Sequence, residues 1–278
     1  LLLHLSTSLA QDKQLTPTTT MEINQHLKLS LVEVFDSLSE SPLNYFQNAT
    51  TILTLAAGAK VDYLNLQQES DDAFHFHHVE INVLQDAHAK TTHINVGARS
   101  SRTQVEAFLK QANAGVNIDG INALHAEQNA DIHTQIHHLC SHTQGGQLVK
   151  NILSDRAHGV FTGKICIKPH SQFIDSKQLS KTLLLSPQAH HQARPILEVS
   201  NDDVKCSHGV AIGQLREEEV FYLTSRGILP TVARKLLCRG FALDILQQLP
   251  PELSTYAKEF LDQKLTLITE KGNQHAEI

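Results

Sequence analysis

VFTGKICI, residues 160–167, carries apolar side chains at Phe161, Ile165 and Ile167, all on one parity of the chain. Because successive side chains of a strand point to opposite faces, this spacing predicts a β-strand with one buried face. The same alternation recurs between about residues 22 and 213, in short runs separated by polar turns. Further examples are Leu27-Leu29-Leu31, Val79-Ile81-Val83, Leu183-Leu184-Leu185 and Ile196-Leu197-Glu198-Val199. So many short strands predict a mainly β protein, built as a sandwich, a barrel or a solenoid.

The connections between these runs favour the β-solenoid. Between the strand candidates there is no amphipathic segment long enough for a βαβ unit, and Asn-Gly hairpin turns are absent. Residues 103–115, TQVEAFLKQANAG, contain good helix formers but also alternate, and their context favours a strand. Polar residues between the apolar stretches are expected at the corners of the solenoid: Asn95, Asn113, Asn122 and Asn129.

The pattern changes after Gly213. Three acidic residues, 217–219, suit the first turn of a helix, and Gly227 suits its end. Pro230 fits the first turn of a second helix, and Pro250-Pro251 separates it from a third helix over about residues 252–268. The sequence therefore predicts a helical region behind a β-rich body.

Composition excludes some classes of protein. The net charge of −6 and the lack of a basic run argue against nucleic acid as the main partner. No apolar run reaches the length of a membrane span. The four cysteines lack a CxxC spacing and are expected to be reduced thiols of a cytoplasmic protein. Residues 1–10, LLLHLSTSLA, are expected to lie in the middle of a longer chain.

Cys206 and His208 lie in DDVKCSHGVAIGQL, residues 202–215, and are the first candidates for chemistry. In a strand they project from one face, and a thiolate with an imidazole suits iron, copper or zinc. Two ligands do not complete a site, so a partner chain or distant residues would supply the others. On spacing alone, a small core thiol and a hydrogen-bonded strand histidine are favoured instead.

A second candidate metal site lies in IHHLCSH, residues 136–142, where His138, Cys140 and His142 share a parity. It lacks carboxylates, and a solvated face of the solenoid explains the residues better. The same interpretation applies to the other histidine groups, His75, His77 and His78, and His190-His191.

Nucleophilic and nucleotide chemistry find no support, because G-x-S-x-G, G-x-G-x-x-G and Walker A patterns are absent. Asp71-Asp72 and Asp202-Asp203 are sequence neighbours and face opposite ways in a strand. A β-helix enzyme acting on carbohydrate is the enzymatic alternative, and it requires clustered carboxylates on one face. A stand-alone metal-binding protein is the other alternative. We expect a protein that is not an enzyme.

The region Val160–Ile228 closely resembles the SufB/SufD family of iron–sulfur cluster assembly scaffolds. Four pieces carry the resemblance: F-x-G-K-I, LLLS-P-x-A, P-x-L-E-V-x-x-D-D-V-K-C-S-H-G and E-x-x-F-Y-L-x-S-R-G-I. Weaker similarity extends upstream through residues 136–161. The form VKCSHG, with Gly209 after the histidine, resembles the SufD branch.

The resemblance implies a right-handed parallel β-helix over residues 21–213, a helical C-terminal domain over 214–278, and an N-terminal remnant or linker over 1–20. It also implies a bacterial SufBCD complex with a SufB-type paralogue and a SufC-type ATPase, and a homodimer is considered for the isolated chain. No cofactor is expected to bind the chain firmly. A nascent iron–sulfur cluster would be shared with SufB, and a flavin is considered in the complex.

The resemblance also implies residue roles. His208, and after it Cys206, would be ligands of the nascent cluster at the SufB interface. The candidates for contact with SufC are Phe221, Tyr222, Ser225, Arg226 and Pro230. For Phe221 and Tyr222, packing against the end of the solenoid is an equal alternative.

Overall fold

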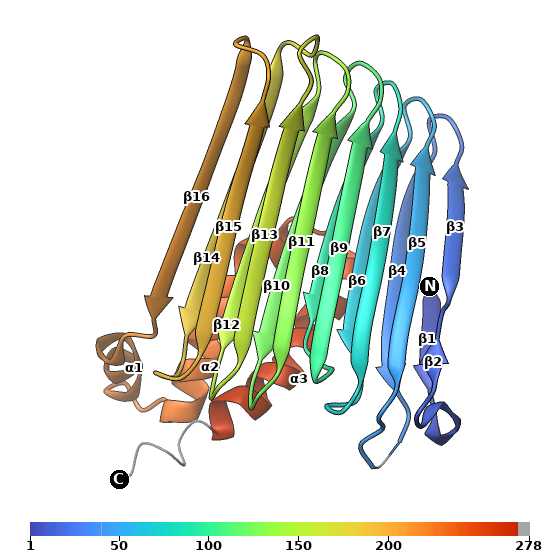
Figure 1. Ribbon diagram of the computed structural model, residues 1–278. Coiled ribbons are helices and arrows are strands. Elements are labelled where there is room, and N and C mark those ends of the chain that lie inside the picture. Colours follow the sequence, from blue (N-terminus) through green and yellow to red (C-terminus); the bar gives the residue numbers. More distant parts are fainter. Residues whose placement is uncertain (40, 272–278) are drawn as a thin grey trace.

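The structure, a computed structural model, describes residues 1–39 and 41–271. Its chain alternates between two parallel sheets that lie face to face (Figure 1). Sheet A contains β1 (Leu2–Ser6), β4 (Lys28–Ser37), β6 (Lys60–Gln68), β8 (His88–Asn95), β10 (Gly115–Leu124), β12 (Gln144–Leu153), β14 (Ile174–Leu184) and β16 (Val204–Gln214). Sheet B contains β2 (Gln14–Leu15), β3 (Thr18–Ile23), β5 (Phe46–Leu55), β7 (Phe74–Val83), β9 (Ser100–Leu109), β11 (Asn129–His138), β13 (His158–Ile167) and β15 (His190–Val199). The predicted parallel β-solenoid is confirmed.

One parity of each strand faces the interior between the sheets. In β13 the inner residues include Phe161, Ile165 and Ile167, all buried, as the alternation predicts. Because the coils stack in register, equivalent inner residues form columns. In one column, which we call the asparagine ladder, Asn95 donates to Asn122 at 3.0 Å and Asn122 donates to Asn151 at 2.8 Å. The ladder supplies the hydrogen bonds that buried amides require.

The corners at one pole, at the top in Figure 1, are built from residues in the left-handed conformation. These residues are His26, Gly58, Asp86, Asn113, His142 and Phe173, with φ between 56° and 69°. Their backbone N–H groups donate to carbonyls of the following coil, as from Gly58 to Gln85 at 2.8 Å and from His142 to Gln172 at 2.9 Å. Inter-coil bonds of this kind let the chain turn without the Asn-Gly pairs of hairpins.

Among the described residues, three helices follow the solenoid: α1 (Glu217–Thr224), α2 (Pro230–Gln247) and α3 (Pro251–Lys271). The helices α2 and α3 lie on the outer face of sheet A, behind the strands in Figure 1. Apolar residues of both helices form one buried cluster with outward side chains of sheet A, from Val34 on β4 to Ile152 on β12. Lys150 of β12 also pairs with Asp244 of α2 at 2.5 Å. The outer face of sheet B carries no described helix.

Two expectations differ from the structure. The segment 1–20, expected as an N-terminal remnant or linker, contains β1, β2 and the start of β3, and these pair with β4 and β5. In β1 the alternation is obscured because the outer residues Leu3 and Leu5 are apolar. Asn95 and Asn122, expected at corners, lie inside strands as members of the asparagine ladder. Of the segment 103–115, expected as a strand, residues 103–109 lie in β9 and residues 110–114 form the turn that follows. Residues 272–278 of the expected helical domain lie outside the described residues.

Candidate functional site

The last coil of the solenoid ends in two edge strands. Within the described residues β15 pairs only with β13, and β16 pairs only with β14 (Figure 1). Side chains that would be buried in an inner coil are open here: Val210 is 44% exposed and Ile212 is 51% exposed. An edge with unpaired N–H and C=O groups and uncovered apolar side chains is a template for pairing with another strand.

Cys206 and His208 lie on β16 and share the inward parity. Their register partners on β14, Ser176 and Gln178, are buried inner residues, so both candidates face the lumen of the solenoid. Cys206 is half-buried against Ile165 and Ile167, and burial with the nearby charge of Asp175 raises its thiol pKa. His208 is exposed at the open end. The strand thus presents an accessible imidazole beside a more enclosed thiol.

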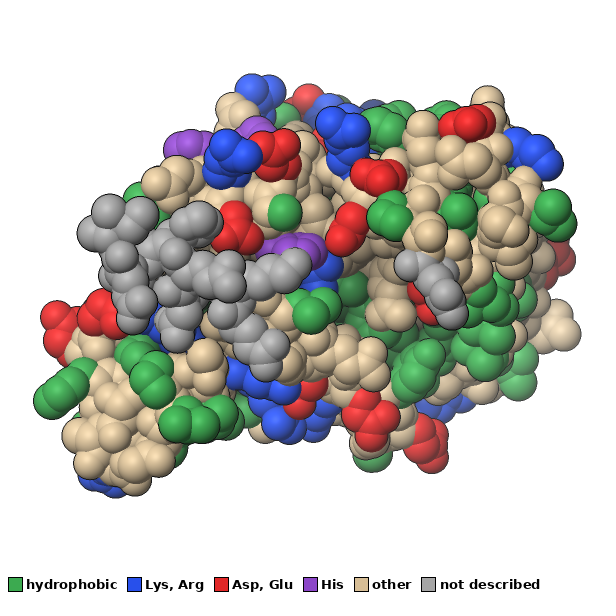
Figure 2. All heavy atoms as spheres, turned by 90° about the horizontal axis from the view of Figure 1, so that it is seen from below, with side chains coloured by type: hydrophobic (Ala, Val, Ile, Leu, Met, Phe, Trp, Pro, Cys, Tyr) green, Lys and Arg blue, Asp and Glu red, His purple; other side chains and the backbone are tan. Residues whose placement is uncertain are grey.

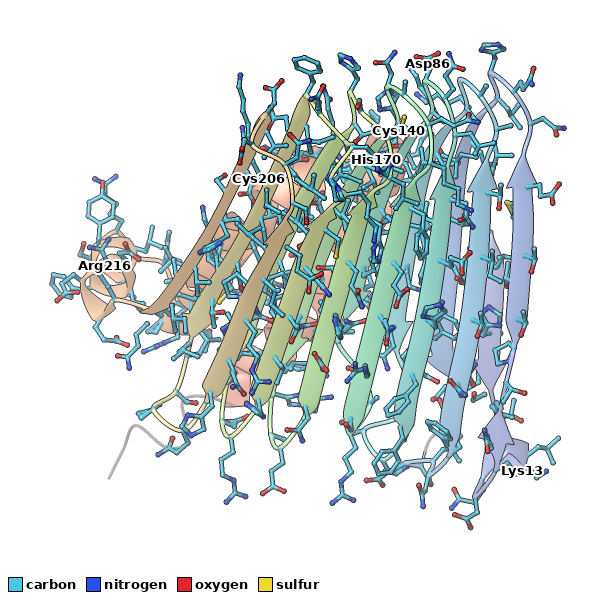
Figure 3. The ribbon with its side chains drawn as sticks, turned by 45° about the horizontal axis from the view of Figure 1, so that its top comes forward. Lys13, Asp86, Cys140, His170, Cys206 and Arg216 are labelled. Atoms are coloured by element: carbon cyan, nitrogen blue, oxygen red, sulfur yellow. The ribbon has the colours of Figure 1, made fainter. Side chains whose placement is uncertain are left out.

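The second candidate metal site does not form. His138 ends β11 and is buried, with Nδ1 2.8 Å from Thr143 Oγ1 and Nε2 3.2 Å from Ser176 Oγ. Cys140 and His142 lie in the turn that follows β11, at the upper pole. His170 and the upper end of β16, with Cys206, lie near the same pole (Figure 3). The left-handed conformation of His142 breaks the shared parity that an extended strand would give. Over the described ranges, no three His, Cys, Asp or Glu side chains are placed to hold a metal ion.

The expectation that His75 and His77 lie on a solvated face is wrong. Both face the interior and are at most 1% exposed, whereas His78 points outward. They share their parity with Val79, Ile81 and Val83, and that signal in the sequence could have placed them inside. They belong to the Glu33 group, which we define as the buried side chains Glu33, Tyr63, Glu69, His75, His77 and His93.

The Glu33 group is held by hydrogen bonds between the first coils. His4 Nε2 lies 2.9 Å from Glu33 Oε1, and the hydroxyls of Thr51 and Tyr63 donate to Oε2. Burial by itself raises the pKa of Glu33, but these bonds outweigh it and lower the pKa to about 2. His93 packs edge-on to Tyr63 with both ring nitrogens unpartnered among the described residues, and burial lowers its pKa to about 4.

An apolar surface lies on α1 and the start of α2. Phe221 is 71% exposed and Tyr222 is 56% exposed, so neither packs against the solenoid end as the alternative expected. The guanidinium of Arg226 lies 4.3 Å from the centre of the Tyr222 ring, and Ser225 Oγ donates to the Tyr222 carbonyl. With the exposed Leu229, Val232 and Leu236, these residues form what we call the α1–α2 patch. Hydrophobic side chains protrude at this end of the molecule, at the lower left of Figure 2.

A groove of about 1120 Å³ lies along the turns at the lower pole, where acidic and basic side chains mix (Figure 2). Its carboxylates are Asp71, Asp72, Glu127 and Asp155. Three of the four hold turns together, because Asp155 accepts from the Ala126 N–H, Asp71 accepts from Gln128, and Glu127 pairs with Arg156. The groove therefore gives little support to a carbohydrate-active enzyme, which needs a free pair of carboxylates.

The four cysteines are free thiols. None of the described helices is long and apolar enough to cross a membrane.

A parallel solenoid with a cysteine and a histidine on an open edge strand, and with helices docked on one sheet, places the chain among the β-solenoid proteins. The chain belongs to the family described as SUF system FeS cluster assembly, SufBD core domain, which matches residues 5–241. Within this family it is of the SufD type.

Three relatives illustrate the membership. An iron–sulfur cluster assembly SufBD family protein of Synechocystis is 30% identical over 84% of this chain and 53% of its own length. SufD of Escherichia coli is 28% identical over 91% of this chain and 60% of its own length. SufD of Bacillus subtilis is 32% identical over 45% of this chain and 29% of its own length. The chain thus spans little more than half the length of the first two relatives.

Proposed function

We propose that this chain is a non-catalytic scaffold subunit, which offers His208 as a ligand to a nascent iron–sulfur cluster shared with a SufB-type paralogue. The observation that carries the proposal is the position of His208, exposed and facing the lumen on the unpaired end strand β16. Imidazole nitrogen and thiolate sulfur are ligands that iron accepts, and a partner strand along β16 would bring the missing ligands. The cluster is the cargo of this site, and Cys206 is its secondary ligand.

Partner pairing follows from the open coil. A second solenoid that continues sheets A and B would satisfy the edges of β15 and β16 and cover Val210 and Ile212. The alternative occupant of this edge is a second copy of the chain, which gives a homodimer when the paralogue is absent.

The α1–α2 patch is the proposed contact for a SufC-type ATPase. Exposed aromatic side chains with an adjacent arginine are the composition typical of protein interfaces. The helices α2 and α3 pack on the outer face of sheet A. A displacement of the α1–α2 patch would therefore act on sheet A, whose edge strand is β16. We further propose that the complex works in the cytoplasm and receives electrons from a flavin held by the assembly.

The test replaces His208 with Ala in a co-expressed complex with the SufB-type and SufC-type subunits. The variant is expected to keep its melting temperature and both partners, but to lose most bound iron and acid-labile sulfide. His190→Ala, at an exposed histidine of the other edge strand, is the matched control and should load normally. Full loading of His208→Ala would refute the ligand role.

The ATPase contact has a separate test. Phe221→Ser is expected to abolish co-purification of the SufC-type subunit while the SufB-type subunit stays bound. Phe173→Ser is the control, because this exposed phenylalanine lies in a turn at the upper pole. Retention of the ATPase by Phe221→Ser would place its contact elsewhere.

A further inference from the structure

Directly beneath His208, the interior of the solenoid holds polar atoms that lack hydrogen-bond partners. Gln178 on β14 is the register partner of His208, and Gln147 on β12 is the register partner of Gln178. These three residues share the inward parity and therefore form one column, which we call the glutamine column. Gln178 is 2% exposed, yet both of its amide atoms are unpartnered among the described residues, as is Oε1 of Gln147. A buried amide with no partner is rare in native proteins and calls for an explanation.

The side chain of Gln178 has space because β13 carries a glycine opposite it. A Cβ at Gly163 would lie 1.9 Å from Gln178 Nε2 and 2.7 Å from Gln147 Oε1. Both amides therefore lie against the face of Gly163 in the lumen. Any side chain at 163 would displace them, so the glycine keeps the two amides next to each other below the last coil.

The lower end of the column has a fixed direction. Gln147 Nε2 donates to the backbone carbonyl of Lys164 at 3.1 Å, so Gln147 Oε1 points the other way as an acceptor. A donor reaching it from the next coil would be Gln178 Nε2, and that orientation leaves Gln178 Oε1 as an acceptor facing His208. The Lys164 carbonyl thus fixes the orientation of the Gln147 amide, and a bond between the two amides would then fix the orientation of the Gln178 amide.

The same chain forms such bonds elsewhere. Register-paired amides bond between coils in the asparagine ladder, and at its open end Asn151 Nδ2 lies 3.1 Å from His191 Nε2. Asn151 on β12 and His191 on β15 belong to different sheets, so this amide-to-imidazole contact crosses the lumen, and the asparagine ladder is the precedent for bonds between register partners.

We infer that Gln178 is a positioning residue for His208: its Oε1 accepts the N–H of one imidazole nitrogen and turns the other nitrogen, unprotonated, to the incoming iron. This inference rests on the proposed ligand role of His208. A histidine binds metal only through a nitrogen that carries no proton, and a bond to the second nitrogen fixes which one that is. The glutamine column therefore sets the tautomer of His208 before the partner or the iron–sulfur cluster binds.

The experiment compares Gln178→Met, which keeps the length of the side chain without a hydrogen-bonding amide, with Gln178→Glu, which keeps an oxygen acceptor. Gln144→Met on the outer face of β12 is the matched control. In the three-subunit complex, Gln178→Met is expected to retain iron about 10- to 100-fold more weakly, with unchanged pairing and melting temperature. Gln178→Glu and Gln144→Met should retain iron as the wild type does.

A second measurement does not depend on iron. In the free chain labelled with ¹⁵N-histidine, with the His208 signals assigned from the spectrum of His208→Ala, one imidazole tautomer of His208 should dominate. Gln178→Met should give a mixture of tautomers. A structural role alone would change the melting temperature and leave the tautomer unaffected.

The outcomes separate the two proposals. Normal loading of His208→Ala refutes the ligand role, whatever Gln178 does. Loss of loading in His208→Ala, together with wild-type loading and an unchanged tautomer in Gln178→Met, overturns the role of Gln178. If Gln178→Met does not fold, Gln178→Glu decides: a folded variant with wild-type loading supports the inference, and a folded variant that fails to load overturns it.

Discussion

Acidification from pH 7 to pH 5 should destabilise this protein through its buried histidines, and His93→Phe should remove a defined part of that loss. His93 is 1% exposed, its ring nitrogens lack partners among the described residues, and its ring packs edge-on to Tyr63. Phenylalanine keeps the ring and gives up no hydrogen bond. We therefore expect the free energy of unfolding of the variant at pH 7 to lie within about 1.5 kcal/mol of the wild-type value.

The magnitude follows from proton linkage. Burial holds the pKa of His93 at about 4 in the fold, below the ordinary value of 6.5. Between these values the unfolded chain binds a proton that the folded chain does not, so stability falls as the pH falls through this window. At pH 5 the unfolded histidine is almost fully charged and the folded one is mostly neutral, which costs about 2 kcal/mol relative to pH 7.

The assay is equilibrium denaturation in urea at pH 7, 6 and 5, for the wild type, His93→Phe and His170→Phe. His170 is exposed, so the same substitution there should leave the pH dependence unchanged. The wild type also carries His138 and His191, whose pKa values are lowered to about 4, so it should lose more than the share of His93 alone. Between pH 7 and 5, the free energy of unfolding of His93→Phe should fall by about 2 kcal/mol less than that of the wild type. Equal losses in both proteins would refute the burial of a neutral His93.

Three further changes test the fold. Asn122→Leu leaves both neighbours in the asparagine ladder without one bond and should lower the free energy of unfolding by about 2–4 kcal/mol, measured by urea denaturation; a loss below 1 kcal/mol would contradict the ladder. Tyr63→Phe removes a hydroxyl that donates to the buried Glu33 carboxylate and should cost about 2 kcal/mol at pH 7, and less below pH 2, where Glu33 is protonated. Gly227 has a φ of 86° with open space around it, so Gly227→Ala should lower the free energy of unfolding by about 1 kcal/mol. Gly240 is exposed inside α2, so Gly240→Ala should raise it by about 0.5–1 kcal/mol. Thermal melts in which both variants shift the melting temperature in the same direction would contradict the backbone assignment.

Alternation in the sequence predicted the mainly β body, because inner and outer faces differ strongly in the middle coils. The connections between the strands favoured the solenoid, and the change of pattern after Gly213 predicted the helical region. It failed in the first coil, where apolar residues lie on both faces of β1. It also treated polar residues as exposed by default. In a solenoid the stacking of coils lets identical polar residues satisfy one another inside, as Asn95 and Asn122 do, and composition does not reveal this.

The candidate site was only partly predictable for a related reason. The spacing of Cys206 and His208 correctly placed them on one face, but which face depends on the register between β14 and β16. Gln178 carries no motif at all. Its importance arises from Gly163 and Gln147, residues on two other strands that only the three-dimensional register brings next to it.

The packing of α2 and α3 on sheet A has a consequence for synthesis on the ribosome. Outward residues of the first coils, such as Val34, Leu64 and Leu66, are covered by Leu261 and other residues close to the end of the described chain. Nearly 200 residues separate Leu66 from Leu261. At the usual rates of translation, the outward apolar residues of the first coils therefore stay uncovered for about 10–40 s after their own coil is made. A growing solenoid can stack coil by coil, yet in this one the outer face of sheet A emerges apolar and uncovered. The nascent chain therefore offers a binding surface for chaperones or for neighbouring copies on the same messenger RNA until its last helix leaves the exit tunnel.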